Sequence, residues 1–60
     1  MTYGEIYTEF CETTNLKDVV EDYRPCVEMY GAPNISNAII VWLKGGSKII
    51  YIANDKVIKV

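Results

Sequence analysis

The sequence predicts one small α+β domain, an N-terminal amphipathic helix followed by a four-stranded antiparallel β-meander that self-associates through a sheet face. Three observations predict it: apolar residues recur at helical spacing near the N-terminus, β-branched and aromatic runs fill the C-terminal half, and a glycine pair separates two of these runs. The chain has 60 residues, so we expect a single domain, 1–60, with a small core.

The N-terminal helix is predicted over residues 3–13. Thr2 and Glu5 have the spacing of a capping box. Apolar residues then recur on one helical face, namely Tyr3, Ile6, Tyr7, Phe10 and Cys11. Glu5, Glu9 and Glu12 fall outside that stripe, and we expect them to face water. Asn15 tolerates the left-handed conformation that commonly ends a helix.

Residues 16–22 fit two interpretations. Their apolar spacing favours a helical turn, whereas the β-branched pair Val19-Val20 and the nearby Pro25 favour an extended chain. We expect a short helical turn or a loop, followed by a strand over about residues 23–30. Because proline cannot donate to a β-ladder, this strand should be an edge strand or contain a bulge. Residues 31–36 have the composition of a loop.

The C-terminal half predicts three strands, over residues 38–43, 48–52 and 56–60. Gly45-Gly46 suits a two-residue hairpin loop, and Asn54-Asp55 suits the next one. This register places one set of residues on one face of the sheet: Ile40, Trp42, Ile49, Tyr51, Ile58 and Val60. It places the other set opposite: Ile39, Val41, Leu43, Ile50, Ile52 and Val57, with Lys48 and Lys59.

Both predicted faces are apolar, whereas one helix covers only one of them. An exposed apolar face of that size usually marks an interface. We therefore predict that the face carrying Trp42, Tyr51 and Ile58 is the interface of a homo-oligomer. The alternative is that segments 16–22 and 31–36 cover the second face.

Charge is distributed unevenly along the chain. The formal net charge is −2, but residues 1–30 hold seven acidic and two basic residues, a net −5. Residues 31–60 hold four lysines and one aspartate, a net +3. This pattern predicts either an acidic helix face beside a sheet whose lysines keep it soluble, or a bipolar surface that docks a partner. A DNA footprint would use the lysines Lys44, Lys48, Lys56 and Lys59, although an acidic chain is atypical of nucleic-acid binders.

Catalytic motifs are sparse. The chain has no histidine, which excludes histidine-based triads and histidine metal ligands. One acidic cluster, Asp18, Glu21 and Asp22, has the oxygen ligands that a divalent metal prefers, but a solvated turn is the favoured interpretation. Cys11 and Cys26 are interpreted as reduced thiols, with a disulfide as the alternative. We expect no catalytic residue, no metal and no cofactor.

The chain contains no apolar run long enough for a membrane span, and its start lacks the features of a secretory signal. We therefore expect an intracellular protein without a membrane partner.

Three stretches together resemble a known group of proteins: Asp22-Tyr23-Arg24-Pro25-Cys26, residues 37–46 (NAIIVWLKGG) and Ile49-Ile50-Tyr51-Ile52. They resemble small prophage proteins of gut Firmicutes, which include short anti-CRISPR inhibitors. One group of these inhibitors is oligomeric, has a sheet-plus-helix protomer similar to positive-cofactor-four single-strand DNA binders, and is associated with nicking supercoiled DNA. Those proteins begin with strands, whereas this chain is predicted to begin with a helix.

The resemblance implies a homo-oligomeric accessory protein of a phage or mobile element, acting in the cytoplasm of a bacterial host. It would bind a protein or DNA partner and inhibit a host defence system. Two alternatives stay open: a metal-assisted DNA-nicking enzyme acting through Asp18, Glu21 or Asp22, and a structural or regulatory subunit with an unrelated partner.

Overall fold

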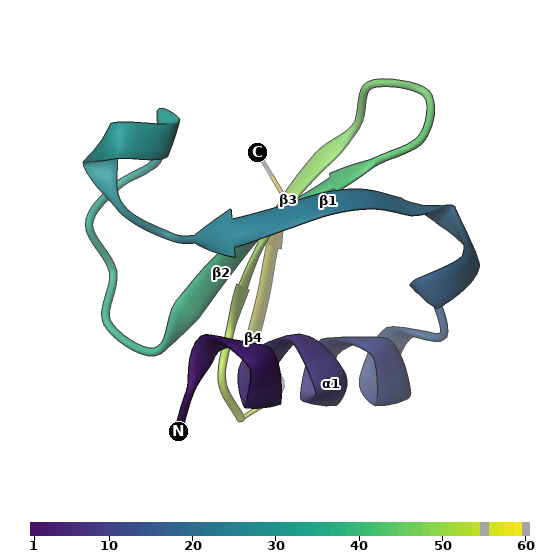
Figure 1. Ribbon diagram of the computed structural model, residues 1–60, viewed down its shortest axis with the longest axis horizontal. Coiled ribbons are helices and arrows are strands. Elements are labelled where there is room, and N and C mark those ends of the chain that lie inside the picture. The colour runs from purple at the N-terminus through teal and green to yellow at the C-terminus, as the bar shows by residue number, and fades with distance from the viewer. Residues whose placement is uncertain (55, 60) are drawn as a thin grey trace.

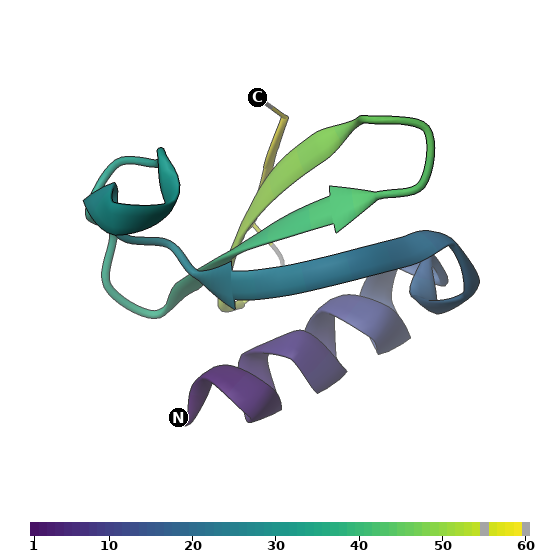
Figure 2. The ribbon, with the colours of Figure 1, turned by 45° about the horizontal axis from the view of Figure 1, so that its top comes forward.

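A single helix packs on one face of an antiparallel sheet (Figures 1 and 2). The computed structural model describes residues 1–54 and 56–59. Its elements are α1 (Tyr3–Thr14), η1 (Lys17–Val19), β1 (Val20–Pro25), η2 (Glu28–Tyr30), β2 (Ala38–Leu43), β3 (Lys48–Ile52) and β4 (Lys56–Lys59), where η denotes a short 3₁₀ turn. The four strands lie side by side in sequence order, β1-β2-β3-β4. The predicted α+β class, with an N-terminal helix ahead of an antiparallel sheet, is confirmed.

Local sequence determines both ends of α1. The Thr2 hydroxyl accepts from the Glu5 amide at 3.2 Å, and the Glu5 carboxylate accepts from the Thr2 amide at 2.8 Å. This backbone hydrogen bond from Thr2 holds the pKa of the Glu5 carboxyl below its usual value. At the other end Asn15 adopts a left-handed φ of 56°, and its amide donates to the Cys11 carbonyl. The predicted capping box and left-handed end are confirmed.

Removing the cap should lower stability measurably. We expect Thr2→Ala to cost about 0.5–2 kcal/mol, because the Glu5 amide loses its acceptor. Thr8→Ala is the matched control, since Thr8 lies within α1 and its hydroxyl donates to a carbonyl of the same helix, that of Gly4. Thermal melting of both variants checks the prediction. Equal melting temperatures for the two would contradict it.

Strand β1 lies at one edge of the sheet, and its pairing with β2 is irregular between Val20 and Asp22. Of the two predicted alternatives, the edge position is confirmed, and the irregularity lies at the start of the strand, away from Pro25. The predicted bounds of 23–30 are wrong, because the strand begins at Val20 and ends at Pro25, and residues 28–30 form η2. Both interpretations of segment 16–22 are partly right, since a 3₁₀ turn leads directly into the strand.

The outer edge of β1 offers few free donors. The Cys26 amide donates inward to the Ala38 carbonyl at 3.0 Å, so strand alternation directs positions 23 and 25 outward. The Tyr23 amide is bound by the carboxylate of Asp22 at 2.8 Å. Pro25 has no N–H. The two outward positions at this end of β1 therefore present no unpaired donor to another strand.

The strand register differs from the prediction by one residue. Trp42 lies opposite Lys48 and Ile39 opposite Tyr51, while in the next pair Tyr51 lies opposite Val57. The first hairpin closes through the Leu43 amide, which donates to the Ser47 carbonyl at 2.8 Å. Three residues, 44–46, thus form the loop instead of two. A shift of one residue exchanges the two faces of a strand, so the predicted face assignment is wrong for β3 relative to β2.

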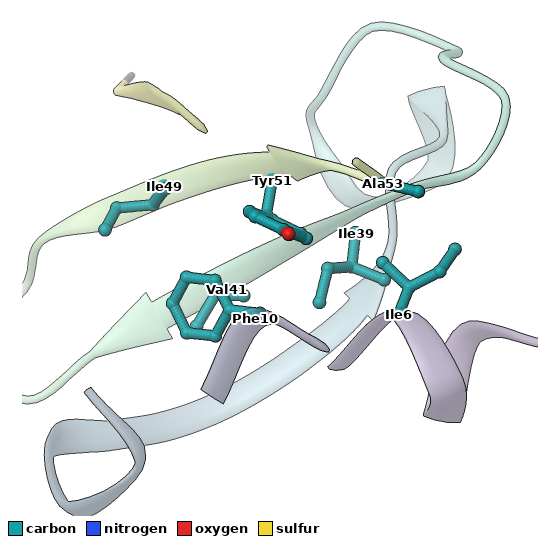
Figure 3. Packing of buried hydrophobic residues seen from close by; sticks show 7 residues of the cluster. All are labelled: Ile6, Phe10, Ile39, Val41, Ile49, Tyr51 and Ala53. Atoms are coloured by element: carbon teal, nitrogen blue, oxygen red, sulfur yellow. The ribbon is translucent and has the colours of Figure 1, made fainter. Parts of the chain in front are cut away.

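The main core lies between α1 and the sheet (Figure 3). This helix-side cluster consists of buried Ile6, Phe10, Ile39, Val41, Ile49, Tyr51 and Ala53. Phe10 meets the ring of Tyr51 edge-on, with 5.4 Å between ring centroids. Tyr7 stacks flat on Tyr23 at 4.0 Å, which joins the helix to β1. Aromatic contacts of this kind add to the stabilisation from apolar burial.

Glu9 connects α1 to the turn after β3. Its Oε2 atom accepts from the Tyr51 hydroxyl at 2.6 Å and from the Asn54 amide at 2.8 Å. The prediction that Glu9 simply faces water is therefore wrong. A buried tyrosine ring needs a partner for its hydroxyl, and the helix carboxylate supplies an acceptor.

Candidate interaction surface

The sheet face opposite α1 carries a second buried cluster. This loop-side cluster consists of Cys26, Ala32, Ala38, Ile40 and Ile50. The connection between β1 and β2, which includes η2, supplies Cys26 and Ala32 to this cluster, and it lies at the end of the sheet where β1 ends and β2 begins (Figure 2). Ile40 is 0% exposed and Ile50 is 3% exposed. The expectation that this face lies uncovered in the protomer is therefore wrong for its centre.

Cys26 belongs to this covering and has a structural role. Its thiol lies 3.2 Å from the Pro33 carbonyl, to which it donates, and burial raises the pKa of the thiol. Cys11 packs instead on the helix-side cluster, across the sheet. Both cysteines are free thiols, which contradicts the disulfide alternative.

The part of this face around Trp42 is less well covered. Trp42 and Lys48 are half-buried, and Asp22 and Arg24 are exposed. The Arg24 Nε atom lies 3.3 Å from the Asp22 carboxylate, and its guanidinium sits over the Tyr30 ring, 5.9 Å from the centroid. We name these five residues, Asp22, Arg24, Tyr30, Trp42 and Lys48, the Trp42 surface. Tryptophan, tyrosine and arginine are the residue types enriched at binding hot spots.

The structure divides the predicted interface set between the two faces. Ile49 and Tyr51 lie in the helix-side cluster, whereas Ile40 and Trp42 lie on the opposite face. The backbone of Ile58 is paired with Ile50 in β4. Val60 lies outside the described residues. The predicted patch therefore does not exist as one surface, although its largest member, Trp42, remains partly exposed.

The acidic cluster does not converge into a metal site. Asp18 lies in η1, while Glu21 and Asp22 lie on β1, and all three are exposed. Asp22 is already bound to Tyr23 and Arg24. Within residues 1–54 and 56–59, no three histidine, cysteine, aspartate or glutamate side chains are grouped to hold a metal ion.

The proposed basic footprint is spread along the sheet. Lys44 lies exposed in the β2–β3 loop, and Lys48 lies beside Trp42 on β3. Lys56 and Lys59 begin and end β4, of which the structure describes the backbone at these two positions. Lys48 is thus the lysine that the register places next to the half-buried tryptophan.

A shallow hollow of about 480 Å³ lies near the C-terminal end of α1. It is lined by Tyr7, Thr8, Cys11, Glu12, Asn15, Lys17 and Asp18. A hydrogen bond with Cys11 raises the pKa of the Tyr7 hydroxyl, and burial adds to the shift. Tyr7 also stacks on Tyr23 and packs against the helix-side cluster, so it is a packing residue here.

Sequence reasoning missed two features of these sites. The pairing of Arg24 with Tyr30 joins residues on either side of a turn, and no periodicity indicates it. The contact between Glu9 and Tyr51 spans 42 positions, so only the folded structure brings them together.

No protein-family model matches the chain, and neither a curated protein nor a solved structure matches it. Among the described residues, no helix has the length and apolar character needed to cross a membrane.

Proposed function

We propose that this chain is a non-enzymatic interaction protein that self-associates through the Trp42 surface. One observation carries the proposal: Trp42, the largest side chain of the sheet, is only half-buried on the face opposite α1. A tryptophan that leaves part of its ring in water gains free energy when a partner covers it.

The surroundings of Trp42 also favour an interface. Apolar contact with the loop-side cluster holds the tryptophan in place, so little side-chain entropy is lost when a partner binds. Charged residues stand around it, with Asp22 and Arg24 on one side and Lys48 on the other. An apolar centre within a polar rim is the usual anatomy of a protein–protein interface.

A charge at position 42 should abolish self-association. We expect the wild-type protein to form a dimer with Kd on the order of 10 μM or tighter, and Trp42→Glu to be monomeric, because a desolvated carboxylate without a partner opposes contact. Tyr3→Glu is the matched control, since Tyr3 is an exposed aromatic residue on α1, 42% accessible. Sedimentation velocity measures both. A monomeric wild-type protein, or a Trp42→Glu protein with the wild-type mass, would overturn the proposal.

A plasmid assay separates this function from the metal-assisted nickase. We expect purified protein to leave supercoiled plasmid intact with and without magnesium, because the three acidic residues are not grouped around one point. The variant Asp18→Asn/Glu21→Gln serves as the comparison. Nicking by the wild-type protein that this variant loses, with its fold intact, would identify an enzyme.

Host defence is the biological setting that we propose for this interaction. The proposal is supported by the resemblance of residues 22–52 to small prophage inhibitors. Expression of the chain in cells that carry an active CRISPR system should restore plaque formation by a targeted phage, and the Trp42→Glu variant should not. Plaque counts that stay unchanged by the wild-type chain in every system tried would favour the structural or regulatory subunit.

A further inference from the structure

We propose that the second copy docks with its two-fold axis parallel to β2, so that Asp22 of each protomer pairs with Lys48 of the other. The inference rests on the proposed self-association through the Trp42 surface and specifies its geometry. It depends on how the sheet register orders charge around Trp42.

Three residues form one row across the sheet. Asp22 on β1 is registered opposite Trp42 on β2, and Trp42 is registered opposite Lys48 on β3. Directly paired residues of antiparallel strands project on the same face. Neighbouring strands lie about 4.8 Å apart, so a negative and a positive side chain flank the tryptophan at similar distances. The row therefore reads acidic, apolar, basic.

In a symmetric dimer, the order of charges in this row determines which two-fold axis brings opposite charges together. In a two-fold dimer the same surface patch contacts itself. An axis parallel to β2 and centred at Trp42 exchanges the two sides of the row, which places each Asp22 against the partner's lysine. An axis perpendicular to the strands leaves each side in place, which sets carboxylate against carboxylate and ammonium against ammonium. Charge complementarity thus selects the parallel axis.

Asp22 has the capacity for this pairing. One carboxylate oxygen accepts from the Tyr23 amide at 2.8 Å, and the other lies 3.3 Å from the Arg24 Nε atom. The side chain is nevertheless 50% exposed, and an ionised carboxylate accepts about four hydrogen bonds in all. These local contacts orient the carboxylate, and its oxygens can still accept further hydrogen bonds. Lys48 is half-buried beside Trp42, so its position is restricted as well.

Charge reversal tests the geometry. The single variants Asp22→Lys and Lys48→Asp should each weaken dimerisation about tenfold or more, because each places two like-charged pairs in the interface. An equimolar mixture of the two variants should recover affinity to within about threefold of wild type, since each lysine at position 22 then meets an aspartate at position 48. Sedimentation velocity on each protein and on the mixture gives these values.

Two controls carry the same changes in charge outside the row. Glu21→Lys changes the exposed residue next to Asp22, and Lys44→Asp changes the exposed lysine of the β2–β3 loop. Both should dimerise within about threefold of wild type, because neither faces a fixed charge across the axis. Circular dichroism melting of every variant separates loss of folding from loss of association.

The outcomes distinguish this inference from the function on which it rests. A monomeric wild-type protein overturns the self-association itself. A dimeric wild-type protein whose affinity neither reversal changes overturns the parallel axis and leaves self-association standing. Should Asp22→Lys fail to fold, the dimer affinity of Lys48→Asp and that of the wild-type protein at rising salt decide the question. Weaker dimerisation in both measurements supports the pairing of Asp22 with Lys48, and unchanged dimerisation in both overturns it.

Discussion

Replacing Phe10 by alanine should destabilise the protein by about 3–5 kcal/mol, the range for a large buried aromatic residue. Phe10 is 0% exposed at the centre of the helix-side cluster. Its ring packs edge-on against Tyr51 and lies near Tyr7, so the truncation removes aromatic contacts as well as apolar burial. A domain of this size has a total stability of only a few kcal/mol. The variant should therefore be largely unfolded at room temperature.

Urea denaturation followed by tryptophan fluorescence measures the effect. Tyr3→Ala is the control, because Tyr3 is an aromatic residue of the same helix that is 42% exposed. It should cost no more than about 1 kcal/mol, since most of the ring stays in water. Similar midpoints for the two variants would show that α1 does not hold the sheet through Phe10.

Ile40→Asp should unfold the protein even more completely. Ile40 is 0% exposed in the loop-side cluster, whose other members are uncharged. Arg24 is registered opposite it on β1, but its guanidinium already lies over the Tyr30 ring and beside the Asp22 carboxylate. Loss of the buried side chain costs about 2–3 kcal/mol, and burial of an ionised group costs several kcal/mol more. Together these exceed the stability of a small domain. A cooperative melting transition should be absent at neutral pH.

Met29→Asp is the matched control for Ile40→Asp. Met29 lies in η2, within the connection that covers this face, and is 81% exposed. It should change stability by about 0.5 kcal/mol or less. If Ile40→Asp instead melts like Met29→Asp, then the β1–β2 connection does not cover the sheet. The original expectation of an open apolar face would then be restored.

Local signals predicted the helix well, and the reason is physical. A capping box, an apolar stripe and a left-handed end residue act within a few residues of one another, so the sequence contains their geometry. The edge position of β1 follows from Pro25 in the same way, whereas its bulge lies between Val20 and Asp22, away from the proline. The end of β1 was not predictable, because Glu28–Tyr30 turns the chain through contacts with residues distant in the sequence.

The strand register could not be derived from the glycine pair. Gly45 and Gly46 do take positive φ values of 94° and 92°, as the turn chemistry predicts. Glycines mark the turn but do not fix its length, and one extra loop residue moved Ile49 and Tyr51 to the helix side. The predicted Trp42–Tyr51–Ile58 patch failed for that reason alone. Trp42 itself lies half-buried on the face opposite α1, and its role in assembly stays a prediction.

The outer edge of β1 opposes the addition of strands from further copies of this protein. A sheet with two open edges can add strands from further copies on both sides, and such growth has no natural end. Here the Asp22 carboxylate occupies the outward amide of Tyr23, and Pro25 removes the next one. Strand addition along this part of β1 therefore lacks donors, and polymerisation through that edge is blocked. The half-buried Trp42 is thus not accompanied by open strand donors on this part of β1, so a contact made through the tryptophan would not extend into a continuous sheet there.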